Sequence, residues 1–399
     1  MIIIHVYMAT LERGMTAVAE AGVLRQLLRE YLDGNAPVTA ALTDSGRTAG
    51  FVRAFQPSAL LVPEEFGGAG GSLTDAVTVA AESGRALLGG QVLGDLLAAA
   101  LLRWAPPSAR RADLLTRLAE GSASVAAPVW TSPECPGFTG TVLTAFPATH
   151  ALVFSAADGG LSLLCAELTP EAVTAQGGMD PTRPLGRLNP DALNPDALGP
   201  DALDPGALGP GVRDGAAAIA RGRDAEELLR RYLALARTAL AAEQAAGARR
   251  CVEMTVAYAH QRIQFGVPIA TFQAVKHTCA TMHIDTAEAE ALAALAISAV
   301  GSDSASTAGD ASTAGSGSTA GNGSRTARLA DQAKALAAEA FIAVARSAIE
   351  VHGGVGFAWE HPVQLFYKRA LVSAAYFGRP AARYAALAAR DTPAEKTLS

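Results

Sequence analysis

Residues 258–277, YAHQRIQFGVPIATFQAVKH, carry the densest signal in this sequence. Apolar residues at helical spacing run up to Arg262, where Gly266 and Pro268 break the chain. A second amphipathic helix is predicted from about Phe272. An arginine at such a break can donate paired, charge-assisted hydrogen bonds to a phosphate or pyrophosphate. The alternative is that Arg262 caps the end of its own helix, and the spacing alone favours this alternative.

A second informative stretch is residues 352–362, HGGVGFAWEHP. Its glycines let backbone N–H groups approach an anion without interference from Cβ atoms, and its two aromatic residues could line a flat ring system. The alternative is a tight turn between helices. No predicted strand precedes the cluster and the glycine spacing of a dinucleotide-binding fingerprint is absent, so the glycines alone favour the turn.

Elsewhere in the chain the residue pattern changes twice, near residues 120 and 222. Residues 16–120 carry helical periodicity broken by Pro and Gly, which predicts an N-terminal helical domain. Residues 121–222 contain short runs rich in Val, Thr, Phe and Leu, which predict a β domain. Helical periodicity returns over residues 223–390, so we expect a C-terminal helical bundle. The predicted fold class is mostly α with a central β domain.

Two low-complexity segments interrupt this pattern. Residues 189–212 form units of about five residues with regularly spaced proline, which predicts a surface loop or serial turns. Residues 301–324 are rich in Gly, Ser, Thr and Ala and predict a flexible linker between two helices. At the N-terminus no signal-peptide pattern is present, and Met8 or Met15 is an alternative start.

Composition excludes several classes of function. The formal net charge of −6 argues against general affinity for nucleic acid or anionic membrane surfaces. No stretch offers about 20 apolar residues free of charge, so no membrane-spanning helix is expected. The four cysteines are widely spaced and predict neither a metal site nor a disulfide framework, so a reducing cytoplasm is the simplest compartment.

Taken together and in this order, several motifs resemble the acyl-CoA dehydrogenase family across nearly the whole chain. The matching motifs are VPEEFGGAGGS (62–72), ESGRAL (82–87), DPTRPLG (180–186), the 258–277 stretch, the 352–362 stretch and Lys368-Arg369. The resemblance implies an N-terminal helical domain, a middle β-barrel-like domain and a C-terminal four-helix bundle. It also implies dimers or tetramers that hold FAD between subunits and act on an acyl-CoA substrate.

The same resemblance implies a set of site residues. Arg262 of the RxQFG motif would reach the flavin pyrophosphate of a neighbouring subunit, and backbone groups of Gly353 and Gly354 would hold the pyrophosphate from the other chain. Arg237 matches the family at a substrate-binding position. The further implied contacts to the cofactor are Gln264, Phe265, Gln273 and Glu350, the last replacing the glutamine of many relatives.

The family reaction requires a carboxylate that removes the α proton of the acyl chain while the flavin accepts the β hydride. Relatives place this base either nine residues after the position of Arg369, which is Gly378 here, or 26 residues before Arg262, which is Ala236 here. Neither is a carboxylate. Glu243 shares a helix face with Ala236 but lies roughly 10 Å along the axis, so a buried structural glutamate is the favoured alternative to an unconventional base.

The middle domain departs from the family as well. Many relatives carry two flavin-contacting motifs there, whereas this chain reads APVWTSPECPGFTG, in which Trp130, Thr131 and Ser132 could take part of that role. Three hypotheses follow. The chain is a subunit of a heteromeric dehydrogenase whose partner supplies the base, a self-sufficient homomeric dehydrogenase with an unconventional base, or a non-catalytic scaffold that binds acyl-CoA or a partner and has lost flavin.

Overall fold

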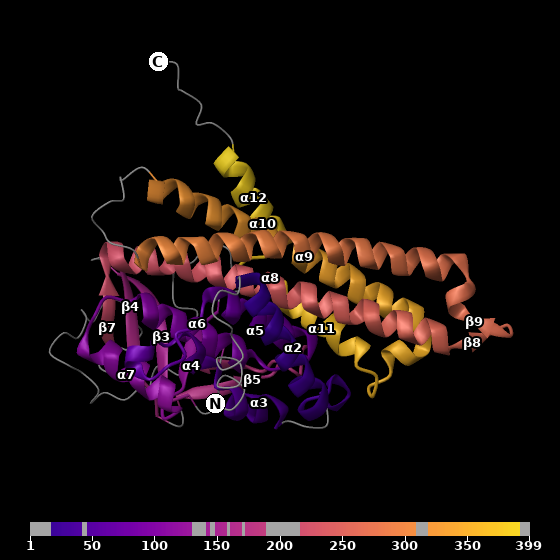
Figure 1. Cartoon of the computed structure of the whole chain (residues 1–399), viewed down its shortest axis with the longest axis horizontal. Coiled ribbons are helices and arrows are strands. Elements are labelled where there is room, and N and C mark those ends of the chain that lie inside the picture. The colour runs from indigo at the N-terminus through magenta and orange to yellow at the C-terminus, as the bar shows by residue number, and fades with distance from the viewer. Residues whose placement is uncertain are drawn as a thin grey trace, which may run out of the picture.

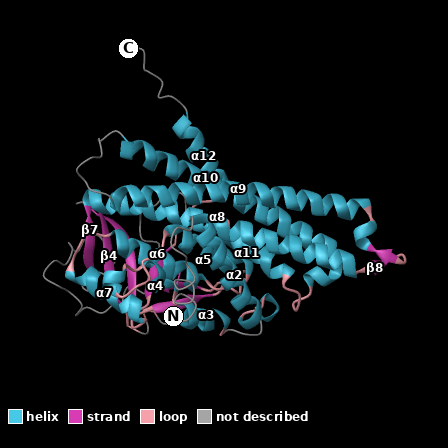
Figure 2. Cartoon of the chain, in the orientation of Figure 1, coloured by secondary structure: helices cyan, strands magenta, loops and turns pink. Residues whose placement is uncertain are grey.

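The computed structural model describes residues 17–41, 46–129, 141–143, 148–157, 160–169, 172–188, 216–308 and 318–391 (Figure 1). Along these ranges helices are followed by strands and then by helices again. The long C-terminal helices run along the longest axis of the molecule, and strands β3, β4 and β7 lie toward the end opposite β8 (Figure 2). The predicted helix-dominated fold with a central β region is therefore confirmed.

Some sequence-based predictions lie outside the described residues. They are the alternative starts at Met8 and Met15, the repeats of residues 189–212, and the contribution of Trp130, Thr131 and Ser132.

The N-terminal helices are α2 (Ala17–Asn35), α3 (Arg47–Phe55), α4 (Pro57–Leu61), α5 (Leu73–Arg85), α6 (Gly90–Trp104) and α7 (Ala109–Glu120). Local chemistry sets two of their ends. Ser72 and Asp75 form a reciprocal capping box that starts α5. Gly121, with φ of 72°, ends α7 in the left-handed conformation that glycine adopts without strain.

The strands form one seven-stranded sheet in the order β5-β6-β2-β1-β3-β4-β7. Their bounds are β1 (Val125–Pro128), β2 (Thr141–Leu143), β3 (His150–Ala157), β4 (Gly160–Glu167), β5 (Val173–Gln176), β6 (Leu185–Leu188) and β7 (Ala216–Arg221). The β1–β3 pair is parallel, and the other pairs described in this sheet are antiparallel. The sequence patterns did not single out β5, β6 and β7, because two of these strands are only four residues long and none alternates clearly.

The C-terminal bundle consists of α8 (Gly222–Gln261), α9 (Gln273–Ala308), α10 (Ser318–His352), α11 (Val363–Ser373) and α12 (Pro380–Asp391). The prediction of a flexible linker over 301–324 is wrong for most of its length, because α9 continues to Ala308 and α10 begins at Ser318. The two helices pack on each other, and just outside this segment the Thr326 hydroxyl donates a hydrogen bond of 3.5 Å to the Ala299 carbonyl. Tertiary packing thus supports helix where composition indicated none.

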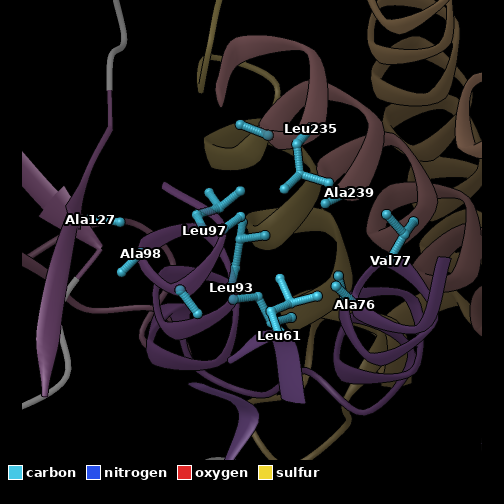
Figure 3. Close-up of a cluster of buried hydrophobic side chains, with 14 of the residues drawn as sticks. Leu61, Ala76, Val77, Leu93, Leu97, Ala98, Ala127, Leu235 and Ala239 are labelled. Carbon is cyan, nitrogen blue, oxygen red and sulfur yellow. The ribbon is translucent and has the colours of Figure 1, made fainter. Parts of the chain in front are cut away.

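One hydrophobic core joins the N-terminal helices, the sheet and the bundle. Figure 3 shows α6 at its centre, where Leu97 points toward Leu235 of α8 and Ala98 lies next to Ala127 of β1. All four side chains are buried. Because α6 contacts both the sheet and α8, the middle of α8 is held in a fixed position relative to the rest of the chain.

Candidate functional site

The 258–277 stretch folds as the end of α8, a short hairpin and the start of α9. The hairpin strands are β8 (Ile263–Gln264) and β9 (Val267–Pro268). Phe265 and Gly266 form its two-residue turn with φ values of 53° and 81°, the positive values that a tight hairpin of this type requires. The hairpin lies at the end of the molecule opposite the seven-stranded sheet (Figure 1).

The hairpin exposes large apolar side chains. Phe265 is 92% exposed, and its ring meets Phe272 edge-on with centroids 6.1 Å apart. Ile263 and Val267 are exposed beside them. A projecting apolar tip of this kind is typical of a contact surface for a ligand or another chain.

Arg262 follows the last residue of α8. Its N–H donates to the Tyr258 carbonyl at 2.8 Å, and its own carbonyl accepts from the Ile269 N–H at 2.9 Å. Its exposed guanidinium group forms no hydrogen bond or ion pair with the described residues. Arg262 therefore caps its helix through the backbone only, and the side chain is available for an anion.

The 352–362 stretch forms the end of α10 and a 3-10 helix over Gly353–Phe357. Gly353 has φ of 62°, which favours glycine, and a Cβ atom placed on either Gly353 or Gly354 would have no neighbour within 4 Å. The backbone of this turn is thus open to close approach by a ligand. Phe357 and Trp359 are both exposed beside the turn.

The two stretches meet through Tyr258 and His352. The two rings stack with centroids 4.4 Å apart, and the Tyr258 hydroxyl donates a hydrogen bond of 3.4 Å to the His352 carbonyl. The His352 ring also contacts the His361 ring, and the two ring centroids are 4.7 Å apart. Burial lowers the pKa of His352, so the neutral imidazole is favoured in this packed cluster. Each of the two stacked residues connects to a site residue. The Arg262 N–H donates to the Tyr258 carbonyl, and Gly353 directly follows His352 in the chain.

The remaining residues implied for the cofactor stay predictions. Gln264 donates to the neighbouring Ile263 carbonyl at 2.8 Å, and Gln273 is exposed in the first turn of α9. Glu350 forms an exposed ion pair of 3.0 Å with Arg346. These side chains are close to Arg262 or Gly353 in the sequence, but no hydrogen bond or ion pair among the described residues joins them directly to either one.

Both positions that correspond to the family base are buried. Ala236 has no exposed surface, and Gly378 follows Phe377 in a buried turn after α11. The Phe377 ring packs edge-on against Tyr232 with centroids 6.0 Å apart. No carboxylate occupies either position, so the two residues that the sequence singled out cannot abstract a proton.

Glu243 lies in a buried network of two carboxylates and two guanidinium groups. Its Oε1 atom accepts hydrogen bonds from Arg183 and, at 3.3 Å, from Arg369. Arg369 also forms an ion pair with Asp180 and donates to the Thr182 hydroxyl at 2.6 Å. Burial acts to raise the pKa of Asp180, but the charge of Arg369 and the hydrogen bond from Thr182 outweigh it and lower that pKa. This geometry favours a structural role for Glu243.

Arg237 belongs to a second buried network, centred on Asp331 of α10. Asp331 is fully buried and pairs with Arg237 at 2.9 Å, Arg383 at 3.3 Å and Arg390 at 3.0 Å. Burial lowers the pKa of Arg237 to about 10, with Asp331 opposing the shift. The predicted substrate-binding arginine is thus held by a carboxylate of its own chain.

Lys334 lies one turn after Asp331 on α10 and is fully buried. Its ammonium group donates a hydrogen bond of 3.3 Å to the Ala374 carbonyl. Burial, together with the charges of Arg237 and Arg383, lowers the pKa of Lys334 to about 7. Sequence reasoning missed Asp331, Lys334 and Arg383, because charged residues in alanine-rich helices are usually solvated and nothing in the local pattern marks them as buried.

Two absences apply to the described part of the chain. No cluster of three or more His, Cys, Asp or Glu side chains there could hold a metal ion. None of the helices that the structure describes combines the length and apolar character needed to cross a bilayer.

Comparisons with known proteins agree with this architecture. A family model described as "Acyl-CoA dehydrogenase, C-terminal domain" matches residues 227–390. The chain is 34% identical over 369 residues to acyl-CoA dehydrogenase IpdE2 of Mycobacterium tuberculosis, covering 89% of this chain and 93% of the relative. It is 33% identical to IpdE2 of Mycolicibacterium smegmatis, covering 81% of this chain and 80% of the relative. A chain of the ChsE4-ChsE5 complex from Mycobacterium tuberculosis has the same fold, with a TM-score of 0.73, 22% identity, and coverage of 96% and 100%.

Proposed function

Because the chain belongs to the acyl-CoA dehydrogenase family, we propose that it is a subunit of an FAD-dependent dehydrogenase whose partner chain supplies the catalytic base. The reaction is α,β-dehydrogenation of an acyl-CoA thioester. The observation that carries the proposal is an exposed Arg262 guanidinium group and an open Gly353 turn, together with burial of Ala236 and Gly378, the two positions that the resemblance assigns to the base.

The residues at the open corner fit the diphosphate of FAD. Arg262 has a guanidinium group without a partner among the described residues, and the Gly353 turn has backbone open to close approach. Guanidinium groups and open backbone N–H groups are two devices that proteins use to bind phosphates. When bound, FAD would supply the acceptor of the β hydride. Arg262 and the turn would bind and orient it, and Phe265 would cover part of it.

The exposed hairpin supports the presence of a second chain. Phe265 at 92% exposure and its apolar neighbours would be costly to leave in water. In the family the arginine of this hairpin reaches the cofactor of a neighbouring subunit. The solved relative described above is a complex of two named proteins, ChsE4 and ChsE5. We extend that arrangement to this chain as a heteromer.

The proposal assigns no catalytic proton transfer to Glu243. A general base must be within hydrogen-bond reach of the substrate proton and free to accept it. Glu243 instead bonds to Arg183 and Arg369 in the interior. This contact pattern supports the heteromer over a self-sufficient homomer that uses Glu243. A reducing cytoplasm is part of the proposal, supported by the buried free thiols of Cys165 and Cys251.

The test is co-expression with an acyl-CoA dehydrogenase chain that carries a carboxylate at the position matching Gly378 or Ala236. We expect the two chains to purify together in a fixed ratio, with a visible flavin absorption band that bleaches when acyl-CoA is added. Substitution of the partner's carboxylate by its amide should abolish bleaching and leave the flavin bound.

The same experiment can overturn the proposal. A yellow homo-oligomer of this chain alone that is bleached by acyl-CoA would establish self-sufficient catalysis. A stable complex without flavin, even after reconstitution with FAD, would favour the scaffold hypothesis.

A further inference from the structure

We propose that Arg383 occupies the space of the side chain that residue 378 lacks, and thereby closes the chain's own acyl-CoA site. The proposal rests on the function given above, which places residue 378 at the base position. It goes further in one respect. The guanidinium group of Arg383, on α12, fills the position and is held in the interior by Asp331. The missing base side chain is therefore replaced by another buried side chain.

The first observation is the direct approach of Arg383 to Gly378. A Cβ atom built on Gly378 would lie 2.4 Å from Arg383 Nε, 2.8 Å from Cζ and 3.0 Å from Nη2. Non-bonded carbon atoms pack best at about 3.5–4.0 Å, so these separations are too short for an unstrained contact. The edge of the guanidinium group therefore fills the direction in which a side chain at 378 would leave the backbone.

The second observation is that Arg383 cannot simply swing away. Its side chain is buried, and its Nη1 atom bonds to the fully buried carboxylate of Asp331 at 3.3 Å. Moving the guanidinium group would break this pair in the interior, where an uncompensated charge is costly. The Nε atom, which lies nearest to the Cβ position of Gly378, has no hydrogen-bond partner among the residues that the structure describes. Packing against the bare glycine backbone, together with the bond to Asp331, therefore sets its position.

The third observation is that the whole turn before Gly378 is held by cations. Arg237 of α8 donates to the Phe377 carbonyl at 3.2 Å, and Lys334 of α10 donates to the Ala374 carbonyl at 3.3 Å. With Arg383 of α12, three helices contribute one cation each to this turn. Phe377 and Gly378 both adopt positive φ, 55° and 106°, a conformation that these surroundings maintain.

These contacts would affect any attempt to restore a carboxylate at position 378. A glutamate introduced at 378 would collide with the guanidinium group and then pair with it, which would favour the ionised form and lower its basicity. A restored base therefore requires a second change at Arg383. A site that was only vacant would accept the carboxylate alone.

The test is a double-mutant cycle on thermal stability, which needs no flavin and no substrate. The variants are Gly378→Ala and Arg383→Ala, alone and combined. Arg390→Ala is the matched control, because Arg390 also pairs with Asp331 but is not among the atoms nearest to Gly378. In both backgrounds Asp331 retains two arginine partners.

We expect Gly378→Ala to lower the melting temperature in the wild-type and Arg390→Ala backgrounds by several degrees more than in the Arg383→Ala background. Part of the cost remains in every background, since alanine is strained at φ of 106°. Equal losses in all three backgrounds would overturn the proposal.

A second measurement decides the matter if Gly378→Ala does not fold in any background. Hydrogen exchange of the amides of residues 376–379 should be faster in Arg383→Ala than in Arg390→Ala. Equal exchange in the two single variants would contradict the proposed closure. Because both measurements read the structure of this chain alone, their failure is distinct from failure of the heteromeric dehydrogenase.

Discussion

The ring of Tyr258, one turn before the end of α8, stacks on the imidazole of His352, the last residue of α10, with centroids 4.4 Å apart. The two residues are 94 positions apart in the chain. This contact brings the arginine of the hairpin and the glycine turn to one corner of the molecule. In the proposed heteromer, Arg262 at this corner would reach the FAD diphosphate of a neighbouring subunit, and the glycine turn would hold a diphosphate from the other chain.

Loss of the stacking between Tyr258 and His352 should destabilise this part of the molecule. Tyr258→Ala removes an aromatic contact worth about 1 kcal/mol beyond its buried area, whereas Tyr258→Phe retains the ring and loses only a long hydrogen bond to the His352 carbonyl. We expect the alanine variant to have a lower free energy of unfolding and less bound flavin in the complex. Urea unfolding and flavin absorbance measure the two effects. Identical behaviour of the two variants would contradict a role for the stacked ring.

Arg262→Gln should weaken FAD binding in the complex by on the order of tenfold or more, since a charge-assisted hydrogen bond to a phosphate is lost. Release of flavin on dilution, followed by fluorescence, measures the change. Arg53→Gln, an exposed arginine on α3, is the control and should leave flavin binding unchanged. If the control and Arg262→Gln release flavin equally, Arg262 does not contact the cofactor.

Glu243→Gln should act on stability first. It removes the carboxylate partner of Arg183 and one of the two carboxylate partners of Arg369, and removing one partner of a buried pair costs roughly 3–5 kcal/mol. Glu227→Gln on the same helix is the control, because its pairs with Arg230 and Arg231 are partly exposed and worth roughly 0.5 kcal/mol. Denaturant unfolding compares them. A Glu243→Gln variant as stable as the control would show that Glu243 is not structural.

Lys334 should make stability depend on pH. Its pKa is about 7 in the folded chain and near its ordinary value of 10.5 in the unfolded chain, so between these values the unfolded state binds more protons. Its contribution to the free energy of unfolding therefore rises as pH increases from 7 toward 10 and is lost as pH falls through 7.

The variant that tests this is Lys334→Met, which should remove the rise and give its largest stabilisation, relative to wild type, at pH 7 and below. Unfolding curves at pH 6, 7, 8 and 9 measure the difference. Lys276→Met, at an exposed position on α9, should leave the pH dependence unchanged. A parallel pH dependence in wild type and Lys334→Met would show that the ammonium group is not buried in a charged state at low pH.

Local patterns were sufficient for much of the fold. Helical periodicity located α8, and Gly266 and Pro268 marked the chain break that became the hairpin, because glycine and proline act on the backbone locally. The linker prediction over 301–324 failed because composition describes what a segment does alone. The contact between Thr326 and Ala299 lies on helices that stabilise each other.

The candidate site also contains residues that sequence motifs could identify and residues that they could not. The residues with a motif around them, Arg262 and Gly353, could be named from sequence, and the structure brings their stretches together. The partners of Glu243 could not be named, since Arg183 and Arg369 are 60 and 126 positions away. In the cluster around Asp331, Arg237 was named from the sequence, whereas Asp331, Lys334 and Arg383 were not.

The family resemblance, the succession of a helical, a β and a helical region, and the absence of a carboxylate at 236 and 378 could all be read from the sequence. These properties depend on residue identity and short-range periodicity. Only the tertiary structure decided that Glu243 is committed to two arginines and that Arg383 lies against Gly378. Ion pairs between distant residues depend on how helices pack, and the free energy of a buried charge depends on every group that surrounds it.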